Sequence, residues 1–68
     1  MNKKSGYAIE SRHGVEYVIV RCPQGHRLRG MKVSGDLKVQ QEVACCVGGC
    51  RMVWTQLLPM NNGFEADE

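Results

Sequence analysis

The sequence has few aromatic residues and no long apolar run. Its 68 residues include one Trp, two Tyr and one Phe, so aromatics make up 6% of the chain. Uninterrupted apolar stretches such as residues 17–20 are far too short to cross a membrane or to form the apolar centre of a signal peptide. A chain of this length buries only about 60% of its unfolded surface, so its apolar core is marginal. We therefore expect one small cytoplasmic domain whose core is supplemented, for example by a metal ion.

Sustained helical periodicity is also absent. Eight glycines and a charged fraction of 24% argue against a long helix or a coiled coil. Short runs rich in β-formers alternate with turn residues instead, and they predict strands at residues 7–11, 15–21, 27–34, 37–44 and 51–58. The predicted class is all-β, with short antiparallel strands. No enzymatic activity is expected, because the chain has no room for a substrate pocket with its supporting shell, and no Cys-x-x-Cys motif follows a βαβ pattern.

Turn signals join some of these strands, and the ends of the chain look different from its middle. Arg12-His13-Gly14 is typical of a hairpin in which Gly14 takes the left-handed conformation. Gly35-Asp36 predicts a second tight turn, between the strands at 27–34 and 37–44. The predicted domain covers residues 7–58. Residues 1–6 are expected to be a disordered N-terminus and residues 59–68 a flexible acidic tail.

Two further strand connections carry the candidate metal ligands. The segment Cys22-Pro23-Gln24-Gly25-His26-Arg27-Leu28 resembles Cys46-Val47-Gly48-Gly49-Cys50-Arg51-Met52, which follows at an offset of 24 residues. Each segment has the form of a zinc knuckle, a tight turn that points two ligands inward and needs glycine where the backbone adopts a positive φ. Two such knuckles supply four ligands, which form a closed tetrahedral site suited to structural zinc. In a reducing compartment, four cysteines indicate metal ligands before disulfides.

The second knuckle offers two candidates, Cys45 and Cys46, for one of its ligands. Cys46 preserves the gapless repeat with Cys22, whereas Cys45 follows Val43 at the spacing that strand alternation directs toward the core. We prefer Cys45; a strained vicinal disulfide between Cys45 and Cys46 is a third alternative. His13 lies in a predicted turn and is expected to be solvated. The predicted zinc ligands are Cys22, His26, Cys45 and Cys50, with Cys46 as the alternate to Cys45.

The order of strand, Cys-Pro-x-Gly-His knuckle, hairpin, cysteine-rich knuckle and strand resembles a zinc ribbon. Over residues 15–58 it is similar to short bacterial and phage zinc-ribbon proteins, including the Com-type regulators that bind nucleic acid. The first knuckle departs from the common pattern of these proteins, because it is Cys-x3-His rather than Cys-x2-Cys. The resemblance implies a regulator that holds one structural zinc ion and binds DNA or RNA.

The charge distribution leaves two kinds of partner open. All nine basic residues lie in residues 1–58 with four acidic ones, and three acidic residues follow in 59–68. The basic residues near the knuckles are candidates for phosphate contacts: Arg21, Arg27, Arg29, Lys32, Lys38 and Arg51. The alternative is a larger protein complex, which could dock on exposed strand edges and on Met31, Met52, Val53 and Leu57. Trp54 is expected in the core rather than in base stacking. No membrane and no small-molecule substrate is expected.

Overall fold

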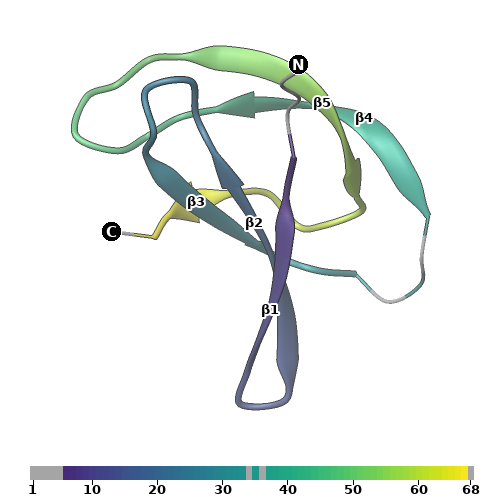
Figure 1. Ribbon diagram of the computed structural model, residues 1–68. Coiled ribbons are helices and arrows are strands. Elements are labelled where there is room, and N and C mark those ends of the chain that lie inside the picture. The colour runs from purple at the N-terminus through teal and green to yellow at the C-terminus, as the bar shows by residue number, and fades with distance from the viewer. Residues whose placement is uncertain (1–5, 34, 36, 68) are drawn as a thin grey trace.

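The fold is all-β, as predicted. A computed structural model describes residues 6–33, 35 and 37–67. The strands are β1 (Ala8–Arg12), β2 (Val15–Arg21), β3 (Arg27–Met31), β4 (Lys38–Ala44), β5 (Val53–Pro59) and β6 (Glu65–Ala66) (Figure 1). These described residues include no helix, and hence none that is long and apolar enough to cross a membrane. The predictions for residues 1–5, Ser34, Asp36 and Glu68 lie outside the described residues.

Two antiparallel sheets make up the structure. The larger sheet has the strand order β1-β2-β3-β6, and the smaller sheet consists of β4 and β5. The β2–β3 turn and the β4–β5 connection lie at the same end of the molecule, whereas the β1–β2 turn points away from it (Figure 1). Both knuckles are therefore strand connections, one in each sheet.

The β1–β2 hairpin has the turn that its sequence predicts. Arg12 pairs with Val15, which leaves a loop of His13 and Gly14. Both loop residues have positive φ, 52° at His13 and 79° at Gly14. Two positive φ angles define a type I′ turn, whose twist matches that of the flanking strands. The left-handed conformation predicted for Gly14 is confirmed.

The core lies between the two sheets and follows the alternation of their strands. Its buried residues are Val18, Val20, Cys22, Leu28, Val43, Cys45 and Leu58. In β4 the residues Lys38, Gln40 and Glu42 are exposed, as the period of two predicts. Trp54 packs against this core, and its indole N–H donates to the buried side-chain oxygen of Gln56 at 2.7 Å. The single Trp therefore packs against the core, as expected.

The predicted hairpin around Gly35-Asp36 does not form among the described residues. β3 pairs with β2 on one edge and with β6 on the other, whereas β4 pairs with β5. The chain crosses between the sheets after β3 because the apolar face of β4, which contains Val39 and Val43, must cover the core from the opposite side. Turn residues alone therefore predicted the wrong pairing.

The structure also differs from the expectation of a flexible tail over residues 59–68. Pro59 still belongs to β5, the N–H of Val33 donates to the carbonyl of Met60 at 2.9 Å, and β6 pairs with β3. Phe64 packs against the core. This segment is held because it brings an aromatic ring to the core and acidic side chains to an arginine-rich sheet face. Residues 59–67 are thus part of the domain.

A close approach at Gly30 generates a stability prediction. A Cβ atom at this position would lie 2.5 Å from the carbonyl oxygen of Gly63 and 3.2 Å from the ring of Phe64. Gly30→Ala should therefore lower the free energy of unfolding by about 1–3 kcal/mol, because the backbone must shift to admit the methyl group. Gly6→Ala is the matched control, since a Cβ there meets nothing within 4 Å. Urea unfolding of both variants checks this, and equal stabilities would contradict it.

Candidate metal centre

Four side chains from the two knuckles converge at one end of the core. Cys22 and His26 belong to the β2–β3 turn, and Cys45 and Cys50 to the β4–β5 connection; their ligand atoms all lie within 4.8 Å of one another. The Sγ of Cys22 lies 3.3 Å from the Nδ1 of His26 and 4.0 Å from the Sγ of Cys50. The Sγ of Cys45 lies 3.6 Å from the same Nδ1. The four residues are close enough to hold one metal ion.

The first knuckle is a tight turn organised around the sulfur of Cys22. The N–H of Cys22 donates to the carbonyl of His26 at 3.0 Å, and the N–H of Gly25 donates to the carbonyl of Cys22 at 2.8 Å. Gly25 has a φ of 96°, a conformation that only glycine adopts at little cost. The N–H of Gln24 donates to the Cys22 Sγ at 3.2 Å. Backbone hydrogen bonds of the turn therefore hold the Cys22 sulfur in position without a metal ion.

The second knuckle repeats this arrangement with one more residue. The N–H of Val47 donates to the Sγ of Cys45, two residues before it, as the N–H of Gln24 does to Cys22. Cys50, however, is five residues from Cys45, whereas His26 is four residues from Cys22. The additional residue is why the gapless repeat pointed to Cys46. The structure buries Cys45 in the cluster and leaves Cys46 exposed.

Burial raises the pKa of both buried thiols, but other contacts separate them. At Cys22 burial is outweighed by hydrogen bonds from the backbone N–H groups of His26 and Gln24 together with contacts to the side chains of His26 and Cys45, so the pKa falls to about 6. At Cys45 burial outweighs the N–H of Val47, and contacts with the sulfurs of Cys50 and Cys22 also act upward, so the pKa rises to about 11. The Cys22 thiolate therefore forms readily, and its negative charge disfavours deprotonation of Cys45. A cation between the sulfurs reverses that opposition, because it favours every thiolate at once.

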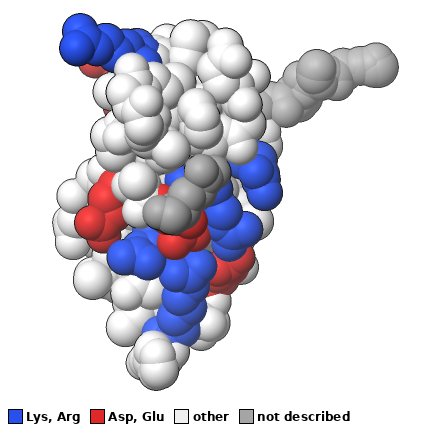
Figure 2. Space-filling model, turned by 90° about the vertical axis from the view of Figure 1, so that its left-hand side faces the viewer, with Lys and Arg blue, Asp and Glu red and all other residues white. Residues whose placement is uncertain are grey.

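The predicted phosphate contacts separate into two groups. Arg21 and Arg27 are register partners, and Arg29 follows Arg27 on the same face of the larger sheet. Figure 2 shows basic side chains in a band down one face of the molecule, with acidic side chains among them. Lys32, beyond β3, and Lys38 and Arg51, on and next to the smaller sheet, are not part of this group. The structure thus brings together three of the six predicted residues.

Sequence reasoning missed Arg12, which belongs to the same face. Its guanidinium lies over the ring of Tyr17 at 5.8 Å, and that of Arg29 lies over the same ring at 5.5 Å. The two-residue turn of the β1–β2 hairpin could have indicated this position. It fixes a register in which Glu10 pairs with Tyr17, and Arg12, two residues after Glu10, lies on the same face of the sheet. We call Arg12, Arg21, Arg27, Arg29 and Tyr17 the arginine face.

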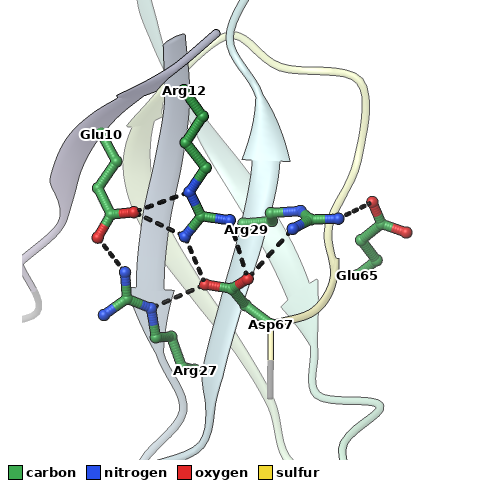
Figure 3. A network of polar contacts seen from close by, with 6 residues as sticks. All are labelled: Glu10, Arg12, Arg27, Arg29, Glu65 and Asp67. Carbon is green, nitrogen blue, oxygen red and sulfur yellow. Dashed lines mark hydrogen bonds and ion pairs between the residues drawn. The ribbon is translucent and has the colours of Figure 1, made fainter. Parts of the chain in front are cut away.

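Acidic side chains neutralise much of the arginine face (Figure 3). The carboxylate of Asp67 accepts from Arg27 Nε at 2.8 Å, from Arg12 at 3.2 and 3.3 Å, and from Arg29 at 3.3 Å. Glu10 bridges Arg12 and Arg27, and Glu65 contacts Arg29. Hydrogen bonds from Arg12 and Arg27 hold the pKa of Asp67 and of Glu10 below its usual value. The acidic residues of the predicted tail are therefore partners of the predicted phosphate contacts.

The remaining basic residues have contacts of other kinds. Lys32 pairs with Glu16 at 3.4 Å and donates to the Gly35 carbonyl at 3.0 Å. The ammonium of Lys38 lies 5.8 Å from the ring centre of Tyr7. Arg21 is exposed and donates to the Gly25 carbonyl at 2.9 Å, and Arg51 is exposed next to Cys50.

In comparisons with known proteins, no protein-family model, no curated protein and no solved structure matches this chain.

The two neighbouring cysteines generate a prediction about metal affinity. Cys45→Ser should weaken metal binding by more than about 100-fold, since even losing a partner outside the ligand set costs about 10- to 100-fold. Cys46→Ser is the matched control and should leave the affinity unchanged, because Cys46 is exposed outside the cluster. Competition with a chromogenic chelator measures both affinities. If Cys46→Ser weakened metal binding more than Cys45→Ser, Cys46 rather than Cys45 would be the ligand.

Proposed function

We propose that the cluster of Cys22, His26, Cys45 and Cys50 holds one structural zinc ion. Zinc bonds of about 2.3 Å to sulfur and about 2.0–2.1 Å to nitrogen imply tetrahedral edges of about 3.5–3.8 Å. Three of the distances between ligand atoms, 3.3, 3.6 and 4.0 Å, lie close to these edges, and all four atoms lie within 4.8 Å of one another. Sulfur and imidazole ligands favour zinc over calcium or magnesium, which prefer oxygen.

The zinc ion in this proposal is a cross-link between the two sheets. Each sheet contributes one pair of ligands through its own strand connection. With all four positions taken by protein side chains, the ion has no open position at which to activate a water molecule. We therefore propose a stabilising role and no enzymatic activity.

Removing zinc should abolish the cooperative fold at neutral pH. A structural zinc ion contributes an apparent 10–16 kcal/mol to folding, about as much as or more than the 5–15 kcal/mol total stability of a typical domain. Native mass spectrometry should find one zinc per chain, and a chelator should eliminate the unfolding transition until zinc is returned. A metal-free sample with sharp, dispersed amide resonances would contradict the proposal.

We further propose that the protein is a zinc-ribbon regulator that binds single-stranded nucleic acid through the arginine face. The observation that carries this is the presence of four arginines on one sheet face together with Tyr17, whose ring lies under two of them, Arg12 and Arg29. Guanidinium groups bind phosphates in pairs of hydrogen bonds, and an aromatic ring offers a base a stacking surface. The resemblance of residues 15–58 to nucleic-acid-binding zinc ribbons supports the same function.

A protein partner is the second candidate. Val53 and Leu57 lie on the outer face of β5 and are 55% and 50% exposed. Met31 is also 46% exposed, whereas Met52 packs against the core. Exposed apolar residues on a two-stranded sheet suit docking to a larger protein, so this surface is the one to mutate if nucleic acid does not bind.

Binding to nucleic acid should weaken steeply with salt. For a labelled single-stranded oligonucleotide, the logarithm of affinity should fall with the logarithm of salt concentration by about 0.7 for each phosphate contact. Arg21→Gln should reduce this slope by about 0.7. Lys38→Gln removes the same charge from the smaller sheet and should leave the slope unchanged. Fluorescence anisotropy between about 50 and 200 mM salt measures both; no salt-sensitive association of the wild type would favour the protein partner.

A further inference from the structure

Asp67 occupies the position that an anionic ligand of the arginine face would take. Three guanidinium groups, from Arg12, Arg27 and Arg29, contact its carboxylate, and its side chain is only 10% exposed (Figure 3). Arginines that converge in this way on one oxyanion form the usual protein site for phosphate. The residue at the centre of the site belongs to the protein itself.

The carboxylate leaves part of this site unsatisfied. The Nε of Arg29 is buried and has no acceptor among the described residues. A carboxylate offers two oxygens in one plane, whereas a phosphate directs its oxygens tetrahedrally. A buried N–H without an acceptor is costly, so an anion with differently directed oxygens would gain a contact that Asp67 does not make.

The charges of the network favour a phosphodiester. The three arginines face three carboxylates, those of Glu10, Glu65 and Asp67. Glu65 lies on β6 and leaves together with Asp67, so the three arginines lose two negative charges when β6 is displaced. A phosphodiester carries one negative charge and restores one of them. We infer that Arg12, Arg27 and Arg29 form a phosphodiester site, and that Asp67, directly after β6, is an internal competitor which the backbone of a single-stranded nucleic acid displaces. This inference rests on the proposed function and adds its regulation.

The strand that precedes Asp67 is short and makes few backbone hydrogen bonds. β6 has two residues and pairs with β3 only through Leu28–Ala66 and Arg29–Glu65. The N–H of Asp67 adds one hydrogen bond, to the carbonyl of Arg27 at 3.0 Å. A strand with so few backbone hydrogen bonds opens at lower free energy than the core. Its release leaves the paired strands β1, β2 and β3 in place.

A surface hollow beside the site fits the rest of a nucleotide. It has a volume of about 350 Å³, and its walls include Tyr17, Met31, Phe64 and, from β6, Glu65, which moves away when β6 is displaced. Arg12 and Arg29 reach both the Tyr17 ring and the carboxylate of Asp67. A phosphodiester at the position of Asp67 therefore places the adjoining base next to an aromatic surface.

The experiment compares Asp67→Asn with Glu16→Gln. Both remove one negative charge, but Glu16 is exposed and pairs with Lys32, outside the network. Asp67→Asn should bind a labelled single-stranded oligonucleotide about 5- to 30-fold more tightly than Glu16→Gln, the ratio that a modest competing contact implies. Equal affinities of the two variants would overturn the internal competitor and leave the proposed function intact.

A second titration uses dimethyl phosphate, a phosphodiester without a base, and observes the arginine Nε–H resonances of Asp67→Asn. Shifts at Arg12, Arg27 and Arg29 support the site even where the oligonucleotide does not bind, in which case the proposed function alone fails. Absence of such shifts overturns the site.

The wild-type protein tests the same inference without a substitution. A saturating oligonucleotide should remove the hydrogen-exchange protection of the Asp67 N–H, since β6 must leave β3. Retained protection with the oligonucleotide bound would overturn the displacement.

Discussion

The cysteine and histidine cluster brings side chains of both sheets to one point, next to an apolar core that is small. That core consists of three valines, two leucines and two cysteines, and the rings of Trp54 and Phe64 lie at its margin. A chain of this size buries only marginally enough apolar surface to offset the entropy of ordering it. The sulfurs of Cys22 and Cys45 belong to the core as well as to the cluster. Core packing and the geometry of the cluster therefore both depend on the contact between the two sheets. Each sheet brings its two cluster residues into place only if its own strands are in register.

The features that local sequence determines were predictable. The strand at 15–21, the turn at Gly14 and the inward direction of Cys45 depend only on alternation and on the φ angles of neighbouring residues. Cys45 shows why alternation was a better guide than the repeat: a strand fixes the direction of its next residue, whereas a loop can gain a residue without disturbing either sheet. Features that depend on distant contacts were missed. Nothing near Gly30 in the sequence indicates that residues 61–64 pass over it.

The positions of the charged residues also depend on contacts between distant parts of the sequence. Along the sequence, basic residues precede a short acidic end, which suggested two regions of opposite charge. In the fold, Asp67 and Glu65 lie against Arg27 and Arg29, so the opposite charges meet on one sheet face. A count of basic residues therefore overstated the charge presented to a partner. The distribution of ion pairs depends on strand order, which places β6 beside β3 and could not be read from composition.

The spacing of the ligands also bears on the order of events in folding. Cys22 and His26 are joined by a single turn between paired strands, and so are Cys45 and Cys50. Each half of the cluster can therefore assemble by closing a short loop within one hairpin, an event on the microsecond scale. Joining the halves brings together Cys22 and Cys50, 28 residues apart, and carries the larger loop-closure entropy. Hairpins that form independently and then share one ion would make metal capture and sheet docking a single kinetic step.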